Sequence, residues 1–404
     1  MIEQKRPFLT KSIILVALSH AVTDLSQGAL PLLLPFLKSA FSLSYSQVGF
    51  IVLAQNITSS VIQPLFGYVS DRYPMPWLVP AGLILSGLGM AITGFAPSYA
   101  SLLAIVIIAG LGIAAFHPQG AKMIHLTSHA NNRGQSMAVF SLGGNLGQAC
   151  GSVFMMVLLT LPGSVNNTIY FCLPSFLLAV MLWRNLPALS PKTAELALSP
   201  VKKKRPDYPI PWAIVSLLLA YIFFRSSIAA GLTTYIPLYF GDYLGGSHAY
   251  ASYLVSGYLL SGVVGTYVGG VLGDRFGRKT IILGSMLLTL PLLILLPHAT
   301  GYWSLPLILA IGFVYIASFS STTVLAQEMM RGYEALGASL TIGFSIGLGG
   351  LAVTLLGYVA DYFGIPAVFS VISVVPIAGA TLAFFLPGRL FKADNVLVNK
   401  EQQL

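Results

Sequence analysis

A few ionisable side chains interrupt apolar stretches of the sequence that otherwise carry almost no charge. Asp24 is the only acid well inside such a stretch, and His20 lies four residues before it. Arg225 lies inside a second stretch and His117 inside a third. In surroundings of low polarity a carboxylate and an imidazole can bind and release a proton, whereas an arginine keeps its charge and suits an anion. These residues predict proton coupling at Asp24 and His20, and binding of an anionic solute at Arg225.

Helical spacing would bring the first of these groups together. His20, Asp24 and Gln27 follow one another at intervals of one turn, so in a helix they share a face. His117 is followed by Pro118, which frees a backbone carbonyl within the helix.

Arg225 is expected in the other half of the chain, at a similar depth to Asp24. An offset of 203 residues aligns it with Val22. Similar depth does not establish contact, and a buried ion pair that only orients helices is the alternative. We also expect substrate to contact His117, Gln27, Gln55 and Asn145, although hydrogen bonds between helices would explain the last two equally well.

The composition indicates that these helices lie in a lipid bilayer. Hydrophobic residues make up 56% of the 404-residue chain and charged residues 8%, whereas soluble domains are about 25% charged. Apolar stretches of about 20 residues or more, the length that a spanning helix needs, recur throughout the chain. Twelve are expected near 10–37, 45–70, 77–97, 99–125, 134–161, 167–187, 210–240, 248–273, 279–298, 303–328, 335–362 and 365–387.

The net charge of +9 is explained by the placement of the basic residues. With the N-terminus inside, Lys38 falls outside and Arg225 within a span, which leaves 19 of the 21 Lys and Arg residues at cytoplasmic ends or loops. This is the positive-inside bias of membrane proteins. It favours a lipid bilayer as the partner, and no nucleic acid. The basic run at 202–205 predicts a cytoplasmic tether between two halves.

No cofactor is expected. The two cysteines lie within apolar stretches, which supports neither a disulfide framework nor a metal site. A Walker phosphate-binding loop, a set of His and Cys residues at zinc spacing and a Ser-His-Asp constellation are all missing from the sequence. We therefore predict no metal and no use of ATP.

A repeated pattern, Gly-x-x-x-Asp-Arg, ends a long apolar stretch in each half of the chain. Its copies begin at Gly67 and Gly270, 203 residues apart, as in a duplicated transporter. The aspartate of each copy can face the positive N-terminus of a helix from the other half, and the glycine permits close helix approach. We expect the gate between the halves to use Gly67, Asp71, Arg72, Gly270, Asp274, Arg275, Arg278 and Glu328.

The second copy continues through Arg278 and Lys279, and the whole string resembles the signature of the major facilitator superfamily. The first copy continues as Tyr73-Pro-Met-Pro-Trp77, which is similar to the fosmidomycin-resistance branch of bacterial exporters. Three further segments resemble that branch: Leu18-Ser-His20, Phe116-His-Pro118 and Gly143-Gly-Asn-Leu-Gly147. The fifth stretch has Gly151-Ser152 where antiporters of the superfamily usually carry Gly-Pro, which weakens any inference about transport direction from that motif.

The residues and the resemblance together predict an all-α integral membrane protein. Its twelve transmembrane helices would form the major-facilitator fold of two pseudo-symmetric six-helix bundles, residues 1–187 and 210–404, joined by a linker at 188–209, with both termini cytoplasmic. The resemblance implies a monomeric drug:H+ antiporter of the bacterial inner membrane that exports a small, anionic compound such as fosmidomycin by alternating access, and not an enzyme. Two alternatives stay open: an importer or symporter of an anionic metabolite, and a membrane-embedded enzyme with Asp24 and the histidines as acid and base.

Overall fold

The computed structural model describes residues 9–73, 75–128, 133–189, 211–299, 301–330 and 334–387. Every regular element in these ranges is a helix. Within them, twelve helical spans are long and apolar enough to cross a membrane. The predicted all-α membrane fold of twelve spans is therefore confirmed. The linker predicted at 188–209 lies outside the described residues beyond Leu189.

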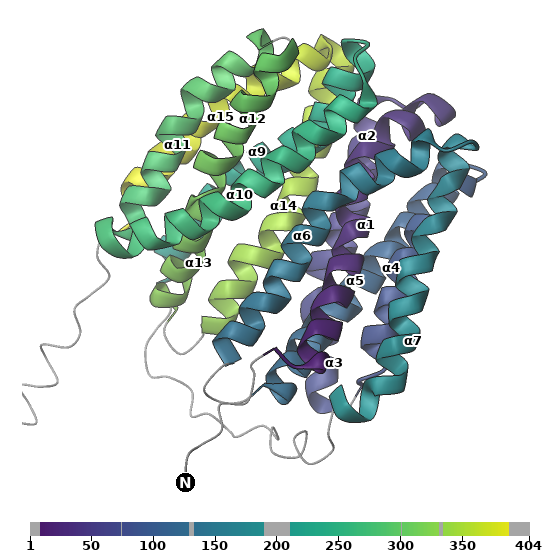
Figure 1. The fold of residues 1–404 in the computed structure, drawn as a ribbon. Coiled ribbons are helices and arrows are strands. Elements are labelled where there is room, and N and C mark those ends of the chain that lie inside the picture. The colour runs from purple at the N-terminus through teal and green to yellow at the C-terminus, as the bar shows by residue number, and fades with distance from the viewer. Residues whose placement is uncertain are drawn as a thin grey trace, which may run out of the picture.

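The first six spans form one half of the molecule and the last six form the other (Figure 1). The first half comprises α1 (Lys11–Phe41), α2 (Tyr45–Asn56), a π-helical turn (Ile57–Val61), α3 (Gln63–Arg72), α4 (Leu78–Ile92), α5 (Tyr99–Thr127), α6 (Arg133–Thr160) and α7 (Cys172–Leu189). The second half comprises α9 (Trp212–Ile236), a π-helical segment (Pro237–Tyr243), α10 (His248–Phe276), α11 (Arg278–Leu295), α12 (Ser304–Ile316), α13 (Ser318–Met329), α14 (Glu334–Phe363) and α15 (Ile365–Phe385).

The two faces of the bundle can be named by the course of the chain. We call the side on which α1 begins and α15 ends the terminal side, and the other the opposite side. Lys279, at the start of α11, donates from Nζ to the backbone oxygen of Phe384, near the end of α15, so both lie on the terminal side. Lys38 and Tyr45, at the end of α1 and the start of α2, lie on the opposite side.

The two halves meet along two helix pairs, α2 with α14 and α6 with α10. The first pair packs through glycines. A Cβ added at Gly49 would lie 2.7 Å from Thr354 Cα, and one added at Gly350 would lie 2.9 Å from Leu53 Cα. Both distances are too short for any side chain, so these backbones touch directly. Small residues permit such close approach between membrane helices.

Within the first half, α1 packs against α6 in the same manner. A Cβ at Gly143 would lie 2.3 Å from the Ala17 oxygen, and one at Gly147 would lie 2.0 Å from the Ala21 oxygen. The spacing of four residues puts both glycines on one face of α6. This close contact fixes the face of α1 that carries His20 and Asp24.

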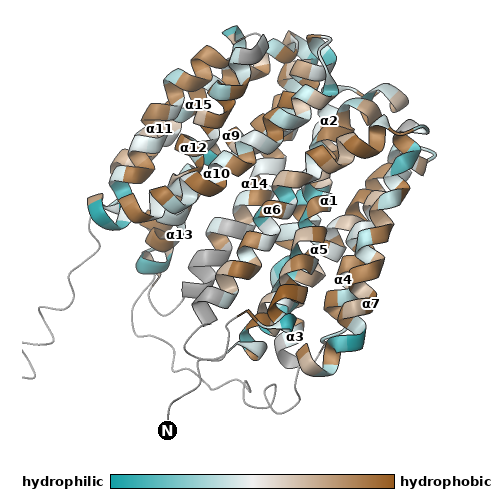
Figure 2. Cartoon of the chain, in the orientation of Figure 1, coloured by the Kyte–Doolittle hydropathy of each residue, from teal (hydrophilic) through white to brown (hydrophobic). Residues whose placement is uncertain are grey.

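The surface of the bundle is suited to lipid. Figure 2 shows helices that are largely hydrophobic along their length, with hydrophilic residues concentrated towards the ends of the bundle. Large side chains such as Trp303, Tyr362 and Phe363 are about four-fifths exposed, at 79%, 81% and 78%. Apolar exposure on this scale marks a surface that contacts a membrane rather than water.

Candidate functional site

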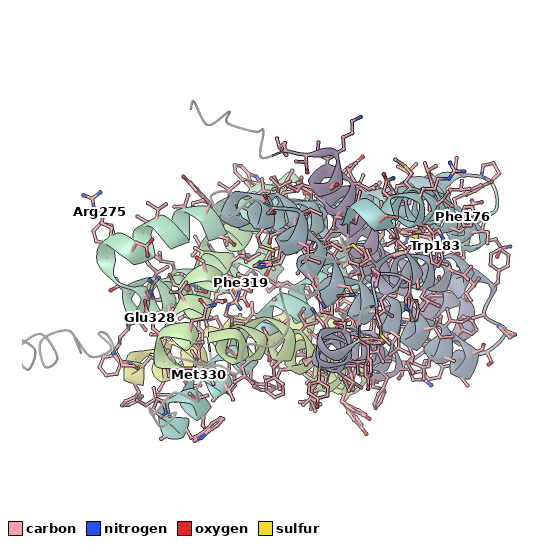
Figure 3. All side chains as sticks on the ribbon, turned by 90° about the horizontal axis from the view of Figure 1, so that it is seen from below. Phe176, Trp183, Arg275, Phe319, Glu328 and Met330 are labelled. Atoms are coloured by element: carbon pink, nitrogen blue, oxygen red, sulfur yellow. The ribbon has the colours of Figure 1, made fainter. Side chains whose placement is uncertain are left out.

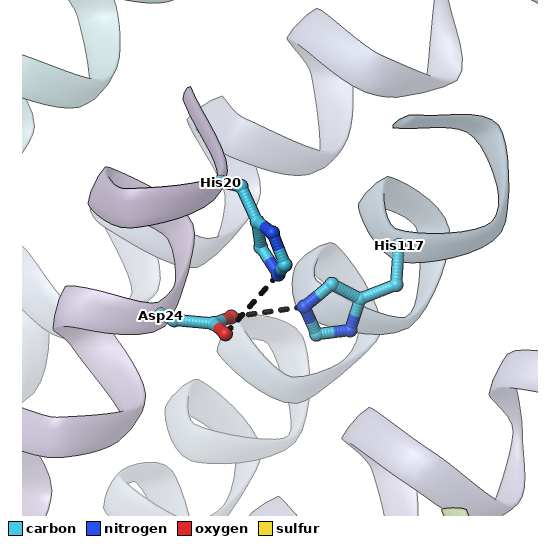
Figure 4. A group of neighbouring side chains, drawn as sticks. All are labelled: His20, Asp24 and His117. Carbon is cyan, nitrogen blue, oxygen red and sulfur yellow. Dashed lines mark hydrogen bonds and ion pairs between the residues drawn. The ribbon is translucent and has the colours of Figure 1, made fainter. Parts of the chain in front are cut away.

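His20, Asp24 and His117 form one cluster in the first half of the molecule (Figure 4). His117 Nε2 lies 2.9 Å from Asp24 Oδ1, and His20 Nε2 lies 3.2 Å from Asp24 Oδ2. α1 supplies His20 and Asp24 one turn apart, as their spacing predicted, and α5 supplies His117. Each carboxylate oxygen of Asp24 thus faces a different imidazole.

The proton arrangement at His20 follows from its second ring nitrogen. Nδ1 lies 2.7 Å from the backbone oxygen of Phe140 on α6. A carbonyl oxygen only accepts hydrogen bonds, so Nδ1 must carry the hydrogen and donate. A neutral His20 would then direct the lone pair of Nε2 at the Asp24 carboxylate. Two acceptors at 3.2 Å repel each other, so this contact requires a proton or another cation between them.

The surroundings of the cluster are apolar and closely packed, but not sealed. The His20 ring stacks on Phe140, with 4.0 Å between ring centroids, and Phe116 lies 5.9 Å away. The side chains of His20, Asp24 and His117 keep exposed fractions of 11%, 13% and 19%. The cluster is therefore partly accessible to water, while its low polarity strengthens the electrostatic interactions inside it.

Gly144 of α6 makes room for the cluster. A Cβ at this position would lie 2.4 Å from His20 Cε1 and 2.8 Å from Asp24 Oδ2. Any side chain larger than hydrogen would therefore displace the imidazole or the carboxylate. This contact gives a structural reason for the glycine in the segment Gly143-Gly-Asn-Leu-Gly147.

The cluster is also the place where a metal ion would fit best in geometry. Among the described residues, His20, Asp24 and His117 form the one group of three His, Cys, Asp or Glu side chains whose ligand atoms all lie within 4.8 Å of one another. The sequence predicted no metal site, because it has no set of His and Cys residues at zinc spacing; His117 joins His20 and Asp24 only in the folded chain. The arrangement provides a cation with two imidazoles and one carboxylate.

Arg225 lies in the second half of the molecule, and no acidic side chain among the described residues forms an ion pair with it. Its side chain is buried on α9, where Nε has no hydrogen-bond partner. Its guanidinium carbon lies 5.6 Å from the ring centroid of Tyr315 and 5.0 Å from that of Phe319, both cation–π contacts. Tyr315 also donates from its hydroxyl to the backbone oxygen of Arg225. Figure 3 shows Phe319 well inside the second half.

Asp24 and Arg225 do not form an ion pair within the part of the chain that the structure describes. Both oxygens of Asp24 face histidines of its own half, and no ion pair joins it to Arg225. The His20–Asp24–His117 cluster and the fixed positive charge of Arg225 therefore lie in different halves.

The other predicted substrate residues are placed differently from one another. Gln55 of α2 is buried, and its Nε2 has no hydrogen-bond partner in the described chain. Gln27 of α1 is half-buried and Asn145 of α6 is exposed. The structure brings none of the three into the His20–Asp24–His117 cluster, and their role in substrate binding stays a prediction.

The second Gly-x-x-x-Asp-Arg copy is tied to its own half. Arg278 Nη1 lies 3.2 Å from Asp274, and Arg278 Nε donates to Glu328 Oε1 at 2.9 Å. Gly270 faces Ser320 of α13, where an added Cβ would lie 3.2 Å from its hydroxyl oxygen. These contacts join α10, α11 and α13. A contact of Asp274 with the first half stays a prediction.

The remaining gate residues lie at helix ends on the terminal side. Arg275 stacks over the Phe276 ring at 5.3 Å, and Figure 3 shows it at the outer edge of the molecule. A Cβ added at Gly67 of α3 would lie 3.6 Å from Pro118 Cβ of α5, an ordinary van der Waals contact. Asp71 and Arg72 end α3, and their side chains lie outside what the structure describes.

The sequence did not indicate the roles of four residues, which are Phe140, Tyr315, Phe319 and Asp361. The Phe140 carbonyl carries no signal at all, because any residue has one. Tyr315 and Phe319 lie four residues apart and share a helical face, which would have marked them as a pair. Asp361 follows Gly357 by four residues, which is the separation of the glycine and the aspartate in each Gly-x-x-x-Asp-Arg copy.

Comparison with known proteins identifies related chains. Residues 16–351 match the model of the Major Facilitator Superfamily. The chain is 31% identical to the fosmidomycin resistance protein of Escherichia coli K12, over 93% of either chain. It is 33% identical to the uncharacterized MFS-type transporter YfnC of Bacillus subtilis 168, over 93% of this chain and 92% of that one.

Solved structures with low sequence identity share the fold. One is a bacterial homologue of the human lysosomal transporter Spinster in an inward-facing, occupied conformation, with a TM-score of 0.76, 13% identity and coverage of 96% and 100%. Another is a D-xylose–proton symporter, with a TM-score of 0.70, 17% identity and coverage of 93% and 97%. The two-bundle arrangement predicted from the sequence is the fold of these transporters.

Proposed function

The chain belongs to the major facilitator superfamily and is a multi-pass membrane transporter rather than an enzyme, and from that premise we propose that it exports a small anionic compound in exchange for protons. The observation that carries this proposal is the contact between His20 Nε2 and Asp24, which requires a proton or another cation. A bound proton is the simplest occupant of that position. Its release when access alternates would couple transport to the proton gradient.

The proton site in this proposal includes His117. Its Nε2 lies nearer to Asp24 than that of His20, at 2.9 Å against 3.2 Å. With two imidazoles on one carboxylate, the three side chains can share one proton or two. We therefore assign His117 to proton binding as well as to the substrate contact that the sequence suggested.

The anionic substrate would bind near Arg225. A buried guanidinium without a carboxylate partner is costly unless another anion balances it. Arginine also keeps its charge at every pH that the protein meets, so it holds an anion and does not exchange protons. The name of the Escherichia coli relative makes fosmidomycin the first substrate to test.

Export requires an orientation and a membrane. The distribution of basic residues supports a cytoplasmic terminal side, and the Escherichia coli and Bacillus subtilis relatives support the bacterial inner (cytoplasmic) membrane. We propose that a single chain is sufficient for transport, because the proton cluster and Arg225 both lie within one chain.

The test is transport of labelled fosmidomycin into inverted vesicles with an imposed pH gradient. An acidic interior should drive accumulation by the wild type, and collapse of the gradient should abolish it. Asp24→Asn should lose gradient-driven accumulation but retain exchange of labelled for unlabelled substrate. Arg225→Ala should lose both, because it lacks the anion site.

His298→Gln provides a matched control. His298 is an exposed histidine on the opposite side of the molecule, and it is far from the cluster residues in the sequence. It should transport like the wild type. Accumulation driven by an alkaline interior would support an importer and overturn export. Full proton coupling in Asp24→Asn would remove Asp24 as the proton site.

A further inference from the structure

Asp361, near the end of α14, binds the N-terminus of α2 across the boundary between the halves. The backbone N–H groups of Tyr45 and Ser46 donate to its two carboxylate oxygens, at 2.6 Å and 2.9 Å. A carboxylate stabilises the positive end of a helix, and hydrogen bonds to a charged acceptor are stronger than neutral ones. This is a charge-assisted contact between the halves, on the opposite side of the molecule.

The two N–H groups that Asp361 binds are the ones that α2 cannot satisfy itself. Ser44 caps α2, accepting from the N–H of Gln47, while the Gln47 side chain accepts from the N–H of Ser44. This capping box leaves the N–H groups of Tyr45 and Ser46 without a partner in the first half. Asp361 therefore completes the N-terminus of α2 from the second half.

Gly357, one turn before Asp361, makes the close approach possible. A Cβ at Gly357 would lie 2.6 Å from both Ser46 Cα and the Tyr45 oxygen. The pattern Gly-x-x-x-Asp is the one that begins at Gly67 and Gly270. On the opposite side, it makes the contact that we expected of those copies on the terminal side: a carboxylate on a helix N-terminus of the other half.

The other contacts between the halves at this end are weaker. Lys38 Nζ lies 3.7 Å from Asp242, in a pair whose side chains are 23% and 39% exposed. The Phe36 ring lies 4.6 Å from that of His248. Exposed ion pairs contribute little to stability. Asp361 is exposed as well, but it makes two short hydrogen bonds to backbone groups of the other half.

We propose that Gly357 and Asp361 form a third functional Gly-x-x-x-Asp element, which we call the Asp361 latch, that holds the opposite side closed and must separate when that side opens. The latch sets the balance between the conformation described here and one open on the opposite side. This inference concerns neither the proton site nor the substrate, so its test needs neither.

The test measures the distance between spin labels on the opposite side. Cysteines replace Ala40 and Leu244, which are exposed and lie in different halves, in a chain whose Cys150 and Cys172 are changed to serine. Without substrate or pH gradient, Asp361→Asn should raise the ratio of long to short distances about tenfold, equivalent to about 1.4 kcal/mol.

Asp242→Asn is the matched control, because it removes a carboxylate on the same side that makes one contact of 3.7 Å. It should change the ratio less than about twofold. Gly357→Ala should shift the ratio in the same direction as Asp361→Asn, because it separates the same helices. The comparison uses protein that elutes as one species. The proposal is overturned if Asp361→Asn leaves the distance distribution unchanged, or changes it no more than Asp242→Asn does.

Discussion

Replacing Gly144 with alanine perturbs the His20–Asp24–His117 cluster without removing any ionisable group. The added Cβ would lie 2.4 Å from His20 Cε1 and 2.8 Å from Asp24 Oδ2. Non-bonded carbon atoms prefer about 3.5–4.0 Å, so the His20 ring must move by about 1 Å. A shift of that size breaks the 2.7 Å hydrogen bond to Phe140 or opens the 3.2 Å contact with Asp24.

The expected cost follows from overpacking. Forcing an extra methyl group into a packed site costs about 1–3 kcal/mol, and we expect the cluster to take most of it because the α6 backbone is fixed against α1. If about 1.4 kcal/mol of this cost reaches the proton-binding geometry, gradient-driven transport falls about tenfold. Exchange of labelled for unlabelled substrate without a gradient should fall much less, because Arg225 is untouched.

The assay compares these two rates in proteoliposomes. Gly284→Ala is the control, since an added Cβ there meets nothing within 4 Å. The double variant Gly144→Ala with His20→Gln separates the cluster from general damage: because both changes act on one contact, it should be no worse than the more damaging single variant. Wild-type coupling in Gly144→Ala, or additive losses in the double variant, would refute the reasoning.

Two further predictions concern stability. Arg278→Gln removes the contacts to Asp274 and Glu328, whose side chains are 72% and 39% exposed; it should lower the free energy of unfolding by no more than about 1 kcal/mol. A large loss of thermal stability in detergent would contradict this. Tyr235→Phe removes a buried hydroxyl that donates to the Val353 oxygen at 2.9 Å between α9 and α14, and it should cost about 1 kcal/mol. An unchanged unfolding temperature would show that the bond contributes nothing.

The fold could be predicted from the sequence because a bilayer leaves few choices. Continuous apolar stretches of spanning length must form helices, since lipid offers no partners for backbone groups. The recurrence of one motif after 203 residues then indicated two equivalent halves. The first inference uses the composition of single stretches of sequence, and the second uses the recurrence of a motif at a fixed offset; neither needs to know which helices touch.

The His20–Asp24–His117 cluster could be predicted only in part. His20 and Asp24 share a helical face through local spacing, and the structure places them in contact. His117 reaches Asp24 from another helix, 93 residues away, and no local pattern measures that separation. The separation of Asp24 from Arg225 also had to come from the structure, because an equal depth in two halves leaves their lateral distance open.

Asp361 lies outside the repeated Gly-x-x-x-Asp-Arg pattern. The repeated pattern was recognised by its Asp-Arg ending, and Asp361 is followed by Tyr362 instead. The arginine that follows the aspartate in the other two copies is typical of the cytoplasmic side of a membrane protein, where basic residues are enriched. The part of the pattern that makes the helix contact is the glycine and the aspartate one turn later, and it serves either side. Gly357 and Asp361 match that part of the pattern.

The separation of these sites constrains how proton and substrate can be coupled. If Asp24 exchanged partners directly with Arg225, the two would need to approach within ion-pair distance, but Asp24 is held by His20 and His117 from its own half. Under the export that we propose, coupling would then act through the relative position of the halves: protonation would alter the charge in the first half, and substrate would alter it in the second. Both changes act on the same equilibrium, which the Asp361 latch biases. Asp361→Asn should therefore change the apparent affinities for proton and substrate together, although it touches neither site.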